Sequence, residues 1–310
     1  MTGAAAATSP GASLLAPEVL ARLERLQLGT RRKLAGRFSG EHRSLRHGTS
    51  LDFADVRDYH PGDDFRRIDY ALFARTDQLF VRLFDAEDDV ELRLVVDRSG
   101  SMGHGGKLLA AERLAAALAF VGLVRRDVVT LSTVPPEPGR AAGHRRFVGR
   151  HATAALFDSL AALHPAGDSD LGVAATHVLA QTGPPGITVL LSDLLSPTWT
   201  TAIERLPGRG ADVAVVHVLS RDELDPDLLG DLELEDSETG ERIAVSMTPE
   251  ARQRYRSAVQ SWLDTVTATC RRRGVAYSRV IADDLVGPGA HPHAVGDVVL
   301  RGWRGEGLVR

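Results

Sequence analysis

The chain has 310 residues, 43% of them apolar and 25% charged, which is the composition of a folded globular protein and not of a disordered one. Its 37 basic and 41 acidic residues leave a net charge of −4, which argues against nucleic acid or an anionic membrane as a partner. Cys270 is the only cysteine, so no intramolecular disulfide can form and a reducing compartment is favoured.

The sequence predicts a cytoplasmic protein without a membrane span. Residues 1–17 are rich in Ala, Gly and Ser, and they lack the basic residues and long apolar stretch of a signal peptide. The longest apolar run, residues 114–124, is too short to cross a bilayer and indicates a buried helix.

The first 90 residues predict a flexible tail (1–15) followed by a small helix and hairpin module (16–90). Apolar residues recur at helical spacing between Pro17 and Gly36. Further on, Asp63 or Asp64 is expected to cap a short helix that reaches Phe73. The apolar runs 79–84 and 90–96 flank an acidic stretch, and we expect them to pair as an antiparallel hairpin.

Residues 91–285 alternate between predicted strands and helices. Such alternation is typical of an α/β domain, with a mostly parallel, Rossmann-like sheet that carries helices on both faces. A second hairpin is predicted around Gly240, and Thr248-Pro249-Glu250 is a strong start for a long helix that Gly274 ends. Residues 286–310, rich in Gly, Pro and His, are expected to form a loose tail. Strands are predicted at 91–96, 127–133, 145–148, 187–192, 212–219 and 275–281, and helices at 107–126, 151–163, 171–181, 199–206 and 248–273.

The loop that follows the first strand of this domain carries the clearest chemical signal. Asp97, Ser99 and Ser101 alternate along it, and Gly100 allows the tight curl that would bring their oxygens together. Because ligands of parallel sheets bind beyond the carboxyl ends of strands, this loop lies at the binding edge. One carboxylate and two hydroxyls form a hard oxygen site, which suits Mg²⁺ or Mn²⁺ better than zinc. Asp193, at the end of another strand, and Asp168-Ser169-Asp170, before a helix, would supply further oxygens.

Three enzyme loops do not fit these residues. A phosphate-binding loop needs Gly at position 101 and Ser or Thr at position 108, where the chain has Ser101 and Leu108. A haloacid-dehalogenase-type loop needs a second Asp in place of Ser99. A Gly-x-Ser-x-Gly nucleophile elbow is broken by Arg98 and Ser101.

The three-loop pattern resembles the metal-ion-dependent adhesion site of von Willebrand factor A-type domains. The resemblance implies that the hydroxyls of Ser99, Ser101 and Ser169 contact a divalent metal. It also implies that Asp97 and Asp193 act largely through water, and that an Asp or Glu of a partner protein completes the coordination. That family usually carries Thr where this chain has Ser169, a departure that keeps the hydroxyl.

The segment before the domain resembles the hallmark block of an uncharacterised bacterial family of A-type proteins associated with MoxR-type AAA+ ATPases. The likeness extends from about residue 30 to residue 285, and the family has Trp where this chain has Tyr70. The residues that carry it are Ser44-x4-Thr49, Asp52-Phe53, Arg57-x-Tyr59-x-Pro61-Gly62-Asp63-Asp64, Arg66-Arg67-Ile68-Asp69-Tyr70 and Ala74-Arg75.

This block is dense in Arg and Asp and poor in aliphatic residues. One interpretation is an ion-pair network that fixes the module to the main domain, with Arg forks on carboxylates. The other is a docking surface for the ATPase, since exposed ion pairs add only about 0–1 kcal/mol each to stability. The candidate partner-binding residues are Arg57, Tyr59, Asp63, Arg66, Arg67 and Arg75.

Together the two resemblances imply a cytoplasmic adaptor and not an enzyme. It would bind a MoxR-type AAA+ ATPase, or a client of that ATPase, through Mg²⁺ or Mn²⁺ and help to remodel or mature a protein complex. Two alternatives remain open at this point. One is a metal-dependent hydrolase that uses the same Asp and Ser cluster. The other is a structural subunit with an empty metal site.

Overall fold

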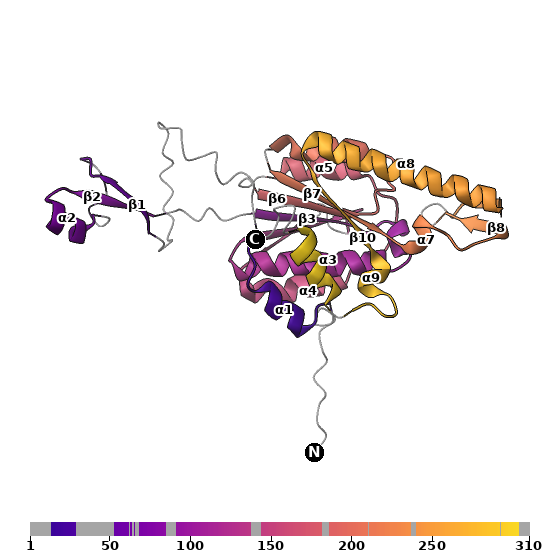
Figure 1. Ribbon diagram of the computed structural model, residues 1–310, viewed down its shortest axis with the longest axis horizontal. Coiled ribbons are helices and arrows are strands. Elements are labelled where there is room, and N and C mark those ends of the chain that lie inside the picture. The colour runs from indigo at the N-terminus through magenta and orange to yellow at the C-terminus, as the bar shows by residue number, and fades with distance from the viewer. Residues whose placement is uncertain are drawn as a thin grey trace, which may run out of the picture. The chain divides into compact units, whose positions relative to one another are not determined.

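The computed structural model describes residues 14–28, 53–61, 63, 65, 68–84, 91–137, 144–181, 186–209, 211–236, 240–291 and 293–303. The chain forms two compact units, both drawn in Figure 1. The sheet unit consists of residues 1–34 and 90–310, and the small unit consists of residues 35–89.

A six-stranded sheet forms the centre of the sheet unit, with strand order β10-β7-β6-β3-β4-β5. Only β5, at one edge, runs antiparallel to its neighbour, so the predicted mostly parallel α/β sheet is confirmed. Every residue of β3 and β6 is buried, because helices cover both faces of the sheet, and the two charged residues Glu91 and Arg93 of β3 pair with each other inside. The strands are β3 (Glu91–Asp97), β4 (Val128–Val134), β5 (His144–Val148), β6 (Gly186–Ser192), β7 (Asp212–Leu219) and β10 (Ala276–Ile281).

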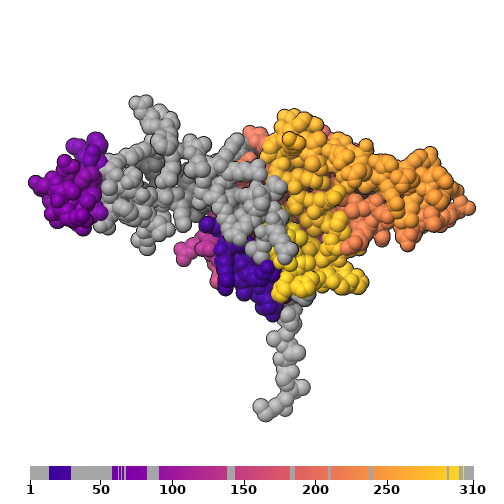
Figure 2. Space-filling view, viewed as in Figure 1, coloured from indigo at the N-terminus to yellow at the C-terminus, as the bar shows by residue number. Residues whose placement is uncertain are grey.

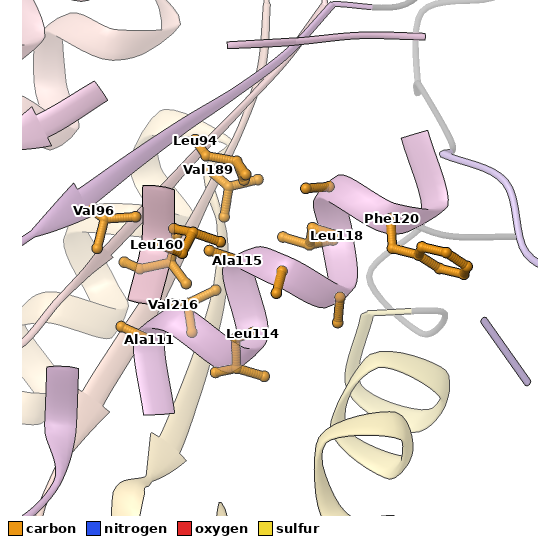
Figure 3. Close-up of a cluster of buried hydrophobic side chains, with 14 of the residues drawn as sticks. Leu94, Val96, Ala111, Leu114, Ala115, Leu118, Phe120, Leu160, Val189 and Val216 are labelled. Carbon is orange, nitrogen blue, oxygen red and sulfur yellow. The ribbon is translucent and has the colours of Figure 1, made fainter. Parts of the chain in front are cut away.

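One face of the sheet packs against α3 (Lys107–Val124), an Ala- and Leu-rich helix that is buried on nearly every side. In Figure 3, Ala111 and Ala115 of this helix lie among Leu94, Val189 and Val216 of the strands. The small alanine side chains let helix and sheet approach closely, and the larger leucines fill the space around them. The other helices in this layer are α1 (Pro17–Leu23), α4 (Thr153–Ala161), with η4 (Arg150–Ala152) before it, and α9 (Ala282–Val286).

The opposite face is covered by α5 (Leu171–Ala180), α6 (Trp199–Arg205), η5 (Leu206–Arg209) and α8 (Pro249–Arg273). Thr248 caps α8 by accepting a hydrogen bond from the N–H of Ala251, and Gly274 ends it in the left-handed conformation, as the sequence predicts. All buried residues of α8 lie between Leu263 and Cys270. The first half of α8 projects with the hairpin β8 (Gly230–Glu235) and β9 (Arg242–Met247), seen as the orange extension in Figures 1 and 2. In the described part of the chain, no helix has the length and apolarity needed to span a membrane.

The small unit corrects two expectations. The run 79–84 does not pair with residues 90–96; instead β2 (Phe80–Phe84) pairs antiparallel with β1 (Phe53–Asp58). The reason is that β3 already has β4 on one side and β6 on the other, and a central strand has no free edge to offer. The short helix is α2 (Tyr70–Thr76), and its cap is Asp69, which accepts from the N–H groups of Ala71 and Leu72, and not Asp63 or Asp64.

The expected domain boundaries also change at both ends of the sheet unit. The predicted module 16–90 is divided, because α1 buries Val19 and Leu23 in the core beside α3. The expected loose tail after residue 285 contains α10 (Ala294–Asp297) and η6 (Val298–Trp303), which bury Val299 and Trp303 completely. Apolar burial within a Gly- and Pro-rich stretch decides this packing, and composition alone hides it.

Candidate functional site

The candidate site lies where two neighbouring strands end. Asp97 is the last residue of β3, and Asp193 directly follows β6, which pairs with β3 in parallel. The loop after β3 turns through η3 (Gly100–Gly103), which carries Ser101, and Ser169 precedes α5. The structure therefore brings to one edge all five residues that the sequence assigns to a metal, and each of them is buried.

The carboxylate of Asp97 is the centre of the cluster. Its Oδ1 accepts the N–H of Ser99 at 3.0 Å, and its Oδ2 accepts hydroxyls of Ser192 at 2.5 Å and Ser169 at 3.3 Å. Burial raises the pKa of Asp97, and the negative charge of Asp193 raises it further, while the hydrogen bonds from Ser192 and Ser99 partly lower it. Ser192 was not among the predicted site residues, although its position directly before Asp193, at the end of an apolar strand, could have indicated it.

The serine oxygens have a spacing that fits a small divalent cation. Ser99 Oγ and Ser101 Oγ are 3.0 Å apart. Two adjacent ligands of an octahedral Mg²⁺, each about 2.0–2.1 Å from the metal, are separated by roughly 2.8–3.0 Å. Among the described residues, no three His, Cys, Asp or Glu side chains gather into a metal cluster, so a metal here depends on these hydroxyls. The donor set is all oxygen, which is the chemistry that Mg²⁺ and Mn²⁺ prefer.

A buried lysine is the main feature that the sequence analysis did not find. Lys107, the first residue of α3, is 0% exposed. Its ammonium donates to Asp193 Oδ2 at 2.7 Å and also bonds Glu223 of α7 (Arg221–Leu224). One signal was present: Lys107 is one of only two lysines in a chain that otherwise uses Arg. The ammonium is a compact point charge with three donors, so it can bond both carboxylates at once.

The ion pairs among the described residues balance only part of the negative charge of this cluster. Lys107 pairs with Asp193 and Glu223, whereas the hydrogen bonds described for the Asp97 carboxylate come from neutral groups. Two negative charges remain when all three carboxyls are ionised, and a buried excess of this kind is costly unless a cation compensates it. The residues present therefore fit a divalent metal in charge as well as in ligand type.

His217 lies beside the site and holds the backbone of Asp193. Its Nε2–H donates to the backbone carbonyl of Asp193 at 2.9 Å, and its Nδ1 accepts the hydroxyl of Tyr277 at 2.8 Å. Burial lowers the pKa of His217 to about 4, so the ring is neutral at physiological pH, and Trp262 packs edge-on against it. This network fixes the backbone from which the Asp193 carboxylate projects.

Hydrogen bonds within the protein join the three loops that carry the site. The loop after β3 is tied to the segment before α5, since Ala166 N–H donates to Arg98 O at 2.8 Å and Gly100 N–H donates to Gly167 O at 2.9 Å. The Arg98 guanidinium reaches the carbonyl of His164 at 2.9 Å. The loop after β6 joins them through Ser196, whose hydroxyl donates to Ser169 O at 2.6 Å. The site is thus preorganised, which lowers the entropic cost of binding a ligand.

Comparison with known proteins places the chain in a family. Residues 55–265 match the family described as "Protein of unknown function DUF58". The chain belongs to this family. An uncharacterized protein of Mycobacterium bovis is 31% identical over 272 residues, covering 83% of each chain, and a relative in Mycobacterium tuberculosis matches equally.

Solved structures give weaker likenesses to this DUF58 member. A conserved hypothetical protein, BatB, from Bacteroides thetaiotaomicron is 15% identical, with a TM-score of 0.37, covering 69% of this chain and 99% of that one. An aerotolerance-related membrane protein from Bacteroides fragilis is 18% identical, with a TM-score of 0.38, covering 62% and 91%. At these values neither structure carries an argument about fold or function.

The DUF58 match begins inside the small unit, where the sequence analysis placed its candidate partner-binding residues. Tyr59 donates its N–H to Leu79 O at 2.9 Å, Asp63 accepts the N–H of His60 at 2.9 Å, and Arg75 is exposed on α2. Arg57 lies in β1, and its side chain is outside the described residues, as are Arg66 and Arg67. Neither the ion-pair network nor the docking surface is tested by these contacts.

Proposed function

We propose that this protein is a von Willebrand factor A-like adaptor that binds a partner protein through Mg²⁺ or Mn²⁺ at the carboxyl edge of its sheet. Ser99, Ser101 and Ser169 would hold the ion, with Asp97 and Asp193 behind them. When bound, the ion supplies a positive charge that a carboxylate of the partner can approach. The observation that carries the proposal is the gathering of Ser99, Ser101 and Ser169 around the buried carboxylate of Asp97, which ends the strand next to the one that Asp193 follows.

The proposed partner system is a MoxR-type AAA+ ATPase or a client of that ATPase. This part rests on the resemblance of the block around Arg57, Tyr59 and Asp63 and on no contact in the structure. In it, the ATPase supplies nucleotide chemistry and this chain supplies recognition during the remodelling or maturation of a complex. The single, buried Cys270 agrees with a cytoplasmic role for such an adaptor.

One observation favours a second candidate, a structural subunit whose metal site is empty. Lys107 already places a permanent cation against Asp193 and Glu223. This ammonium compensates negative charge at the cluster without an added ion.

Thermal unfolding with and without metal separates the two candidates. An ion present at 100 times its dissociation constant adds about 2.7 kcal/mol, which raises the melting temperature by roughly 5–10 °C for a unit of this size. We expect millimolar Mg²⁺ or Mn²⁺ to produce this rise in the wild-type chain and not in Ser101→Ala. Ser278→Ala is the matched control, because it makes the same change on the edge strand β10, away from the site.

The result against the proposal is equally clear. If neither ion raises the melting temperature, and direct titration with Mn²⁺ detects no bound ion, the empty-site candidate replaces the adaptor. If metal stabilises Ser101→Ala as much as the wild type, the ion binds elsewhere.

A further inference from the structure

An apolar groove lies next to the candidate metal edge and has no role in the site described above. Its volume is about 300 Å³, at the small end of the range for ligand pockets. It runs between the loop after β6, the end of β7 with α7, and one face of α8. The residues that line it are Leu195, Leu219, Glu223, Leu224, Tyr255, Ala258, Val259 and Trp262.

The groove and the candidate metal site share a loop. Asp193 ends β6, and two residues later Leu195 forms one wall of the groove and donates its N–H to Asp193 Oδ1 at 3.1 Å. Between them, Leu194 has a left-handed φ of 56° and is 0% exposed. This turn sends Leu194 into the core and leaves Leu195 52% exposed. Leu195 therefore presents an apolar side chain at the surface two residues from a candidate metal ligand.

Glu223 is a second connection between the groove and the candidate metal site, because it lines the groove and pairs with Lys107. Among the described residues that line the groove, it alone carries a charge. The Lys107 ammonium donates to Oε1 of Glu223, and the N–H of Ser220 donates to Oε2 at 2.8 Å. Both oxygens of Glu223 are engaged within the protein, and the other residues that line the groove are uncharged, so the groove presents mainly apolar surface.

The wall formed by α8 is a single helix face. Tyr255, Ala258, Val259 and Trp262 recur at the spacing of one face, and the Tyr255 hydroxyl is fixed by a 2.7 Å hydrogen bond to Glu223 O. Trp262 also packs on His217, below Asp193. Two residues that line the groove, Glu223 and Trp262, therefore also support the candidate metal site, through Lys107 and His217 respectively.

We propose that the groove receives a large apolar side chain from the same partner segment that supplies a carboxylate to the metal. The recognised element is then an acidic residue with a Leu, Ile, Met or Phe a few positions away. This inference rests on the proposed function and names the chemistry of its partner. The groove volume suits one or two side chains, and the adjoining metal edge selects for the acid.

Selection from a random dodecapeptide library displayed on phage tests the proposal with the full chain. We expect selection in millimolar Mg²⁺ to enrich peptides that combine Asp or Glu with a nearby large apolar residue. In the best such peptide, replacing the apolar residue by Ala should weaken binding about tenfold or more, since burial of such a side chain is worth about 1.5–3 kcal/mol. Replacing Asp by Asn or Glu by Gln, or adding EDTA, should abolish binding.

Two variants of α8 locate the apolar contact. Ala258→Arg places a long charged side chain in the groove from an exposed position and should weaken binding as much as the peptide Ala substitution does. Ser257→Arg is the matched control, because Ser257 is exposed on the opposite side of the same helix and should leave binding unchanged.

The outcomes separate this inference from the proposed function. Binding that needs metal and carboxylate, but is unaffected by the apolar-to-Ala change and by Ala258→Arg, overturns the groove and leaves the adaptor standing. Binding that needs the apolar residue and Ala258, but survives EDTA, removes the metal-dependent function while the groove remains an interaction site. No enrichment in Mg²⁺ overturns the inference, and stabilisation by Mg²⁺ then decides separately whether the metal site exists.

Discussion

Lys107→Met removes a buried cation while keeping most of the side-chain volume. The wild-type ammonium is 0% exposed and lies between Asp193, whose side chain is 1% exposed, and Glu223, whose side chain is 21% exposed. Methionine fills the space of the lysine stem and removes the ammonium that both carboxylates bind. The substitution therefore tests the electrostatic contribution of Lys107 more than its packing.

The expected loss follows from the burial of the partners. Breaking a buried ion pair from one side costs about 3–5 kcal/mol, because the remaining charge stays desolvated. Asp193 is fully enclosed and contributes most of this cost, whereas Glu223 retains contact with water and contributes less. We expect Lys107→Met to lower the free energy of unfolding by about 3–5 kcal/mol at neutral pH and low metal.

Urea unfolding followed by circular dichroism and tryptophan fluorescence measures this loss. All three tryptophans lie in the sheet unit, at positions 199, 262 and 303. Arg205→Met is the matched control, since it removes an exposed cation and should change stability by about 0.5 kcal/mol or less. The proposed metal site adds a second expectation: Mg²⁺ should stabilise Lys107→Met more than the wild type, because a repelling charge has gone.

A loss of less than about 1 kcal/mol would refute the reasoning on burial. It would show that the Asp193 carboxylate regains contact with water once the lysine is removed. An equal response to Mg²⁺ in both chains would instead refute the assignment of the metal to this cluster, with the electrostatic cost left intact.

Two further predictions concern buried groups away from the site. Burial raises the pKa of Glu112 from 4.5 to about 8, so its stabilising effect is complete below pH 4.5 and is lost as pH rises toward 8. Glu112→Gln should therefore gain stability relative to wild type with rising pH, by up to about 5 kcal/mol at pH 8; a pH-independent difference in urea unfolding contradicts this. Trp303→Ala should destabilise the sheet unit by about 3–5 kcal/mol, as measured by thermal unfolding. A change below about 0.5 kcal/mol would restore the interpretation of the C-terminal segment as a loose tail.

The part of the candidate site that could be predicted consists of residues that lie close together in the sequence or directly after an apolar strand. Asp97, Ser99 and Ser101 lie in one loop, and the position of Asp193 after an apolar strand places it at the same edge once a parallel sheet is inferred. Lys107 and Glu223 were not predictable as a pair, because 116 positions separate them and neither stands in a pattern that signals the other. The role of Ser192 was hidden because a serine at a strand end is usually a cap or a turn residue.

The sequence by itself determined the class of the sheet unit and most of its elements. Largely apolar runs in β6 and β7, their alternation with helices and the Ala- and Leu-rich pattern of α3 leave few arrangements other than a covered parallel sheet. The cap at Thr248 and the glycine at Gly274 fixed the ends of α8, because their effects operate within a few residues.

Only the tertiary structure decided which distant segments meet. Strand pairing follows from which edges remain free, so β2 joins β1 once β3 is enclosed between β4 and β6. The burial of Trp303 depends on apolar surface contributed by the rest of the fold. The ammonium of Lys107 likewise becomes a site feature only when folding removes water and brings two carboxylates to it. Hydrophobic periodicity is a local property of the chain, whereas burial and charge compensation belong to the assembled fold.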